Sequence, residues 1–134
     1  MKHQMPALAR MTALTLLAAG SLATAFAAST KKQPVAEPVD FSSQIRPLIS
    51  SKCFSCHGPD ESSRKAKLRL DLRDDAIKDH KGTRPIVPGD AASSEMFRRI
   101  TATDPDDIMP PPKTGRTLSA VEIDLLKRWI QCGE

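Results

Sequence analysis

A CFSCH segment near the middle of the chain has the residue types and the spacing that attach a haem group covalently. Cys53 and Cys56 place two sulfurs on one side of a single helical turn, where they can reach the two vinyl groups of one haem. His57 can then face the iron. A thioredoxin-like redox pair would need a βαβ context, and a zinc site would need a second Cys/His pair, but only His80 and Cys132 remain beyond residue 30. The pattern therefore predicts one haem c held by Cys53, Cys56 and His57.

The iron of such a haem needs a second axial ligand opposite His57, or it leaves that position open to a small molecule. The candidates beyond residue 30 are Met96, Met109, His80 and Cys132. Met109 precedes three prolines, and their fixed backbone lowers the entropy that is lost when the loop is ordered. Met96 has helical spacing to apolar neighbours, which is typical of a core residue. We predict Met109 as the distal ligand, with His80 or an open position as the alternatives.

Three main helices are predicted to surround the haem, and the first of them leads into Cys53. Asp40 is a suitable N-cap, and the apolar residues at positions 41, 45, 48 and 49 share one helical face. Pro47 interrupts this segment, because a proline inside a helix removes a backbone hydrogen bond and costs about 3 kcal/mol. We therefore predict a kink or a helix boundary at Pro47.

The other two helices follow later in the chain. Asp90 or Ser93 can cap a short helix that runs through residues 94–100. The last helix is marked at its start by a capping box of Ser119 and Glu122. Its predicted apolar face consists of Val121, Leu125, Leu126, Trp129 and Ile130.

The segments between these helices carry further predictions. Residues 67–72 alternate polar and apolar side chains, which predicts a short strand that pairs with residues 85–88 in a small two-stranded element. Arg64, Lys65, Lys67, Arg69 and Arg73 make the stretch around this strand cationic, and Arg69, which lies between two leucines, is our candidate partner for a haem propionate. The alternative for Arg69 is a place on a solvated basic face. Residues 108–112, IMPPP, are expected to form an extended polyproline-type loop.

The first 27 residues have the pattern of a secretory signal peptide. A basic start with Lys2 and Arg10 precedes a short apolar run, and an Ala-Phe-Ala cleavage site ends at Ala27. The alternative is an uncleaved N-terminal anchor. Residues 28–39 are then predicted to be a linker, and residues 40–134 one domain. We expect a periplasmic or secreted protein.

Composition limits what the mature chain can bind and bury. Removing Lys2 and Arg10 with the signal peptide lowers the net charge from +4 to +2, so we expect no nucleic-acid partner and, after cleavage, no membrane association. Without residues 1–27 the chain has one Trp, three Phe and no Tyr, which leaves it a small core of its own. A buried porphyrin would supply the missing apolar mass. The protein without haem is therefore expected to be weakly folded.

Seven motifs in combination resemble the planctomycete-type cytochrome c domain. They are the apolar run at 41–49, CFSCHGPD at 53–60, LRLD at 68–71, VPGD at 87–90, RRI at 98–100, IMPPP at 108–112 and LKRWI at 126–130. The resemblance implies an all-α, cytochrome c-like fold with His57 as proximal ligand and Met109 as distal ligand. In that family the domain usually stands at the N-terminus of a longer secreted protein. This chain is accordingly either a free-standing small cytochrome or a piece of a larger protein.

These features predict a monohaem c-type cytochrome that carries single electrons between periplasmic partners, such as a dehydrogenase-like domain and another cytochrome or an oxidase. The alternative is a haem-based sensor or small-ligand-binding domain with a labile distal position. An enzyme in its own right is disfavoured, because the sequence contains no second haem motif and no visible pair of nucleophile and base. A monomer is expected, with the thiol of Cys132 partly buried at the end of the last helix rather than cross-linking two chains.

Overall fold

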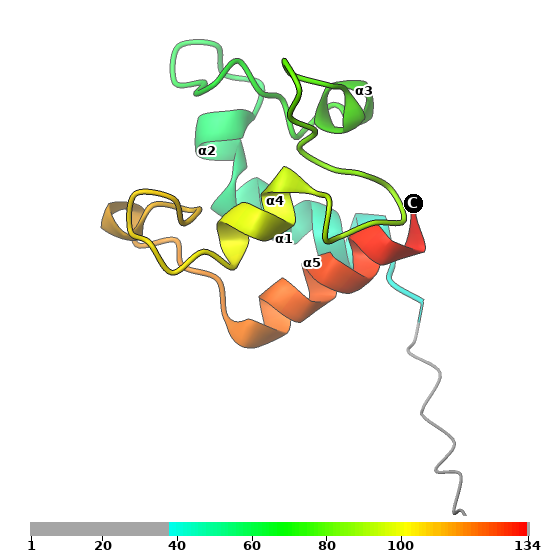
Figure 1. The fold of residues 1–134 in the computed structure, drawn as a ribbon. Helices are drawn as coiled ribbons and strands as arrows, with labels where there is room; N and C mark the ends of the chain where they lie inside the picture. The colour runs from blue at the N-terminus through cyan, green and yellow to red at the C-terminus, as the bar shows by residue number, and fades with distance from the viewer. Residues whose placement is uncertain (1–37, 134) are drawn as a thin grey trace, which may run out of the picture. The chain divides into compact units, whose positions relative to one another are not determined.

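The structure, a computed structural model, describes residues 38–133, and the regular elements of this part are all helices (Figure 1). The α-helices are α1 (Arg46–Lys52), α2 (Phe54–His57), α3 (Arg73–Ile77), α4 (Glu95–Ile100) and α5 (Ala120–Cys132), with a π-helical turn η1 (Phe41–Ile45) and a 3-10 turn η2 (Pro112–Thr114). The predicted all-α class is therefore confirmed for residues 38–133, and none of their helices is long and apolar enough to cross a membrane. The predicted signal peptide, residues 1–27, and most of the predicted linker, 28–39, lie outside the described residues.

Asp40 begins the helical segment that leads to Cys53. Its carboxylate accepts a hydrogen bond from the Ser43 backbone N–H at 2.6 Å, as an N-cap does. The turn η1 passes into α1 at Arg46, so Pro47 lies in the first turn of α1, where a proline is tolerated. The boundary predicted at Pro47 is confirmed.

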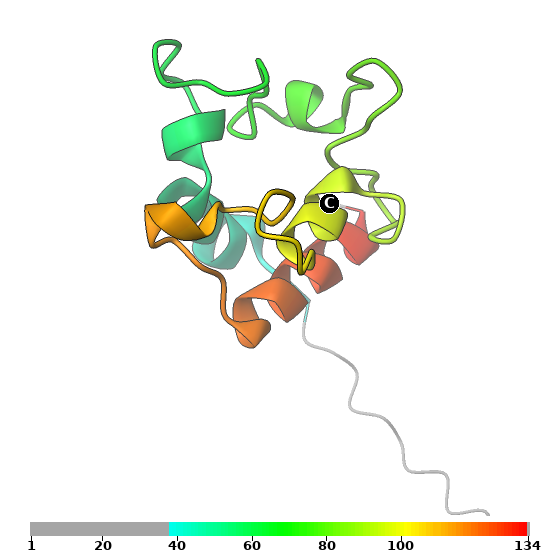
Figure 2. The ribbon, with the colours of Figure 1, turned by 60° about the vertical axis from the view of Figure 1, so that its left-hand side comes forward.

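Helix α5 completes the core by packing against both η1 and α4 (Figure 2). The rings of Trp129 in α5 and Phe41 in η1 lie 5.6 Å apart, centroid to centroid. The larger buried side chains of η1, α1, α4 and α5 are Ile45, Ile49, Met96, Ile100, Leu126, Trp129 and Ile130. Burial of apolar side chains thus holds segments from both ends of the described chain together. Each Å² of apolar surface removed from water stabilises the fold by about 25 cal/mol.

The predicted capping box at the start of α5 is confirmed. The Ser119 hydroxyl accepts the Glu122 backbone N–H at 3.3 Å, and the Glu122 carboxylate accepts the Ser119 backbone N–H at 2.7 Å. The assignment of Val121 to the buried face is wrong, because its side chain is 78% exposed. Val121 precedes the buried Leu126 by five residues, which is about 140° around a helix of 3.6 residues per turn.

The cap of α4 differs from the prediction. Ser94 occupies the N-cap position, whereas Asp90 and Ser93 bind each other in the preceding turn, where the Asp90 carboxylate accepts the Ser93 N–H at 3.0 Å. Ser94 is buried, and its hydroxyl accepts the Val87 N–H and donates to the Asp90 carbonyl, both at 2.8 Å. The buried hydroxyl therefore fixes the segment before α4 instead of capping the helix with its side chain.

The predicted two-stranded element at residues 67–72 and 85–88 is wrong, because neither segment forms a strand. Lys67 has a φ of 56°, which lies in the left-handed region and is incompatible with an extended strand. The Leu70 N–H donates to the backbone carbonyl of His57 at 2.8 Å. This segment therefore packs along the end of α2 and satisfies its backbone there.

Candidate functional site

An apolar cavity of about 470 Å³ lies against α2. Its volume falls within the range of about 300–1,000 Å³ that is typical of ligand pockets. The three residues of the attachment motif line it together with side chains of α4, of the segment after α2 and of the proline loop, including Cys53, Cys56, His57, Leu68, Leu70, Met96, Ile100, Met109 and Pro110. The predicted attachment residues and the predicted distal ligand thus share one cavity, although they are far apart in sequence. Figure 2 shows the backbone segments that carry these residues.

The attachment motif occupies a helical turn, as its spacing requires. Cys53 is at once the C-cap of α1 and the N-cap of α2, and its carbonyl accepts the His57 N–H at 2.8 Å. The next residue, Gly58, leaves no room for a side chain, because a Cβ there would clash with the backbone carbonyl oxygen of Phe54 and lie 2.8 Å from the Phe54 Cβ. Arg64 donates to the carbonyl of Gly58 at 3.0 Å and so holds the chain where it turns away from α2.

Both thiols of the motif are free to form thioethers, and Cys53 lacks the depressed pKa of a reactive redox cysteine. Both are free and half-buried. Burial, reinforced by the neighbouring Cys56, raises the pKa of Cys53 to about 11. Reactive CxxC pairs instead have depressed thiol pKa values, since the thiolate is the nucleophile and the metal ligand. In addition, no group of three or more His, Cys, Asp or Glu side chains within residues 38–133 is arranged to hold a metal ion.

The His57 imidazole suits a metal ligand. Its Nδ1 is buried and has no hydrogen-bond partner among the described residues. Burial lowers the pKa of His57, and the nearby backbone of Lys65 opposes only part of this effect. The ring is therefore neutral at neutral pH, which is the state that binds a metal. A neutral imidazole beside two thiols on an apolar wall fits the requirements of a covalently held haem.

Other candidate ligands also line the cavity. Met96 contributes to its wall while it belongs to the buried core, as its helical spacing indicated. His80 lies there too, with its Nε2 2.9 Å from the Asp75 carbonyl oxygen. Cys132 is not among the lining residues. Its expected partial burial is wrong: it is exposed, because it follows the buried Ile130 by two residues and so lies about 160° from it around α5.

The loop that carries Met109 is tied down at its start and at its end. The Met109 N–H donates to the carbonyl of Arg99, the penultimate residue of α4, at 3.0 Å. Beyond the prolines, the Thr117 carbonyl accepts a hydrogen bond from Lys52 of α1 at 2.8 Å. The chain bends at residues 109 and 110, and the turn η2 begins at Pro112, so the continuous extended loop predicted for residues 108–112 is not formed.

Arg69 does not line the cavity in this structure. Its guanidinium pairs with the Asp71 carboxylate, with Nε 3.1 Å from Oδ1, and its backbone N–H donates to the Asp75 carboxylate at 2.7 Å. Its role toward a haem propionate stays a prediction. The cationic side chains that do line the cavity are Lys52, Lys65, Arg99 and Arg116. Of these, Lys65 belongs to the cationic stretch around Arg69 from which the sequence predicted a propionate partner, and the other three had no such signal in the sequence.

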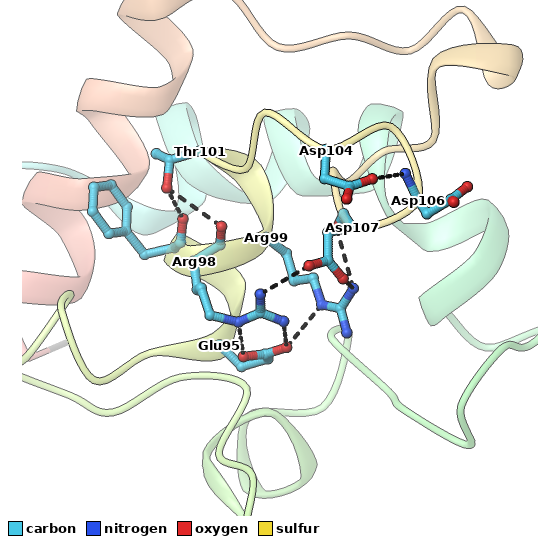
Figure 3. A network of polar contacts seen from close by, with 8 residues as sticks. Glu95, Arg98, Arg99, Thr101, Asp104, Asp106 and Asp107 are labelled. Carbon is cyan, nitrogen blue, oxygen red and sulfur yellow. Dashed lines mark hydrogen bonds and ion pairs between the residues drawn. The ribbon is translucent and has the colours of Figure 1, made fainter.

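An ion-pair cluster joins α4 to the segment before Met109 (Figure 3). The Glu95 carboxylate accepts from Arg98 Nε at 2.7 Å and from Arg99 Nε at 2.8 Å. Arg99 Nη1 then donates to the Asp107 carboxylate at 2.6 Å. Hydrogen bonds from Arg98 and then Arg99 hold the pKa of Glu95 at about 2, with burial acting in the opposite direction. We call Glu95, Arg98, Arg99 and Asp107 the α4 cluster.

The low pKa of Glu95 predicts an acid dependence of stability that Glu95→Gln should remove. The carboxylate stabilises the folded state fully above its unfolded pKa near 4.5, and this contribution is lost as the pH falls toward 2. Between pH 5 and pH 2 the unfolding free energy of the parent should fall by about 1–3 kcal/mol more than that of Glu95→Gln. Urea unfolding at a series of pH values measures this. Asp124→Asn, which breaks the exposed Arg128–Asp124 pair on α5, is the control and should keep the parent's acid dependence.

Comparison with known protein families matches the segment that contains most of the cavity residues. Residues 53–113 match the family described as Planctomycete cytochrome C. The matched segment begins at Cys53, includes His57 and Met109, and contains every member of the α4 cluster. Neither a curated protein nor a solved structure matches the chain significantly.

Proposed function

Because the chain carries a planctomycete-type cytochrome c domain, we propose that it holds one haem c covalently and passes single electrons between partners in the periplasm. One observation carries this proposal: Cys53, Cys56, His57 and Met109 all line the same apolar cavity. Thioethers from the two cysteines would anchor the group, and His57 and Met109 would be its axial ligands. When bound, haem c supplies a one-electron iron couple.

The residues around the cavity suit electron transfer better than substrate binding. If His57 and Met109 take both axial positions, no position is left for a substrate. The thioether of Met109 is neutral and favours reduced iron, so the reduction potential should exceed that of a site with two histidines. Apolar side chains such as Leu68, Leu70 and Ile100 would keep water from the site.

The partners that we propose are a dehydrogenase-like domain as donor and another cytochrome or an oxidase as acceptor. Docking should be weak and short-lived, with an interface at the small end of the known range, below about 1,200 Å². The low net charge of +2 for the chain without Lys2 and Arg10 would give little long-range steering. We place the mature protein in the periplasm, after cleavage near Ala27, as a monomer.

Methionine substitutions test the ligand assignment. The oxidised parent should show the methionine-to-iron charge-transfer band, Met109→Ala should lose it, and Met96→Ala and His80→Ala should keep it. The physical reason is that only the residue bound to iron can contribute to that band. Visible absorption spectra of the four purified haem proteins are the measurement.

Carbon monoxide binding to the reduced proteins separates electron transfer from ligand sensing. The parent should bind carbon monoxide far more weakly than Met109→Ala, because a bound thioether occupies the position that the gas needs. If the parent binds carbon monoxide as readily as Met109→Ala, the distal position is open or labile, and a haem-based sensor replaces the electron carrier.

A further inference from the structure

Arg99 makes contact with the Met109 loop through both its backbone and its side chain. Its carbonyl accepts the Met109 N–H at 3.0 Å. Its Nη1 donates to the carboxylate of Asp107 at 2.6 Å and lies 3.3 Å from the backbone carbonyl oxygen of that residue. The Arg99 side chain therefore binds Asp107, two residues before the proposed distal ligand, and the Arg99 backbone carbonyl binds the N–H of that ligand, Met109.

The turn that Arg99 contacts, residues 104–108, has hydrogen bonds of its own. A contact that fixes Asp107 therefore also fixes the rest of this turn. The Asp104 carbonyl accepts the N–H groups of Asp107 and Ile108, at 3.1 and 2.9 Å. The Asp104 carboxylate accepts the Asp106 N–H at 2.9 Å (Figure 3). A displacement of Asp107 should therefore also displace Met109, because only Ile108 lies between them and it is hydrogen-bonded into the same turn.

The helix that carries Arg99 is anchored in the core. Met96 and Ile100 of α4 are buried, and the Met96 N–H donates to the Pro85 carbonyl at 2.9 Å. The Glu95 carboxylate accepts a hydrogen bond from Arg99 Nε at 2.8 Å, which leaves Nη1 of the same guanidinium to bind Asp107. Arg99 is thus placed by a fixed helix and a carboxylate before it reaches the loop.

Arg98 offers an internal comparison. It shares the same two carboxylate partners, Glu95 and Asp107, but its distance to the Asp107 carboxylate is 3.4 Å and its side chain is 49% exposed, against 33% for Arg99. Solvent screens an exposed, long ion pair more strongly than a short, half-buried one. Arg98 should therefore contribute little to the position of the loop.

From this geometry we propose that Arg99, acting through Asp107, is a positioning residue that holds Met109 on the iron and so limits how often the distal position opens. The inference rests on the proposed function, because it needs Met109 as the distal ligand. It adds a control element: the strength of the contact between Arg99 and Asp107 sets the accessibility of the iron to small molecules.

The test uses the haem-loaded parent with Arg99→Gln, Asp107→Asn and, as matched control, Arg98→Gln. Arg99→Gln and Asp107→Asn each remove a charge-assisted hydrogen bond, whose loss should shift the equilibrium between bound and released Met109 about tenfold toward release. The affinity of the reduced protein for carbon monoxide should therefore rise about tenfold in both variants. Arg98→Gln should stay within about twofold of the parent. The double variant Arg99→Gln/Asp107→Asn should match the single variants, because both break one contact.

The control readouts separate positioning from general stability. Helical circular dichroism should be unchanged in all variants, whereas the methionine-to-iron band of Arg99→Gln and Asp107→Asn should weaken at a lower temperature than that of the parent. If Arg99→Gln does not accumulate with haem, Arg99→Lys keeps the charge and loses the forked donor, and it should raise the affinity about threefold.

Three outcomes overturn the inference. Carbon monoxide affinities equal to the parent's in both Arg99→Gln and Asp107→Asn would exclude a role in positioning. An effect of Arg99→Gln without one of Asp107→Asn would mean that Arg99 acts directly on the cavity that it lines. A parent without the methionine-to-iron band would reject the proposed ligand set itself, and the inference with it.

Discussion

Replacing Cys53 and Cys56 together by alanine is expected to move the haem colour from the protein into the organic phase on acid-acetone extraction. The structure places both thiols on the wall of the apolar cavity, beside the neutral imidazole of His57. A thioether is covalent and survives acid and solvent, whereas a bond between iron and a protonated histidine does not. The effect should be all or none: essentially complete retention of colour by the parent and essentially complete loss from the double variant.

Cys132→Ala is the matched control for this experiment. Its thiol is exposed and does not line the cavity, so its removal should leave the colour on the protein. Each single variant, Cys53→Ala or Cys56→Ala, can still form one thioether and should retain colour in part. Extraction of colour from the parent would contradict covalent attachment, and retention by the double variant would assign attachment to other residues.

Gly58→Ala should destabilise the haem domain by about 2–4 kcal/mol, which is at the upper end for a single substitution. The backbone conformation of Gly58, φ −119° and ψ −158°, is open to any residue, so the cost is steric. The added Cβ would meet the backbone carbonyl oxygen, Cβ and Cα of Phe54, and backbone atoms cannot swing aside as a flexible side chain can. Relief requires a shift of α2, which carries Cys56 and His57.

Urea unfolding of the haem-loaded proteins, together with the yield of haem per chain, measures this prediction. Gly115→Ala is the control, because Gly115 has a φ of 66° and a Cβ added there would have nothing within 4 Å of it. That variant should cost only about 1 kcal/mol, from the left-handed backbone alone. Equal costs for the two variants would show that the clash at Gly58 is relieved without disturbing α2.

The sequence was sufficient to predict those features of this domain that depend on residues close together in the chain. The caps at Asp40 and Ser119 were predictable because donor and acceptor lie within three residues of each other. The boundary at Pro47 followed from a missing N–H. The helical turn of the attachment motif followed from the spacing of its cysteines.

The hydrogen-bond partners of the segments between the helices depend on tertiary packing and could not be predicted from the sequence. The alternation at residues 67–72 predicted a strand wrongly because the Leu70 N–H finds its acceptor on His57, in another segment. Asp90 does not cap α4, because its carboxylate accepts the Ser93 N–H in the turn before the helix, and the buried hydroxyl of Ser94 accepts the Val87 N–H instead of capping the helix. No local pattern distinguishes these partners, since each backbone donor is satisfied by whichever acceptor the packing brings near.

The candidate site divides in the same way. Cys53, Cys56 and His57 were identifiable from the sequence by itself, because one helical turn brings them together regardless of the rest of the fold. That Met109 lines the same cavity, and that Arg99 holds the turn before it, depends on how α4 packs against the core. The proline loop made Met109 a candidate ligand in the sequence, but its place at the cavity and the contact between Arg99 and Asp107 join residues whose spacing carries no periodic signal, so the tertiary structure decided them.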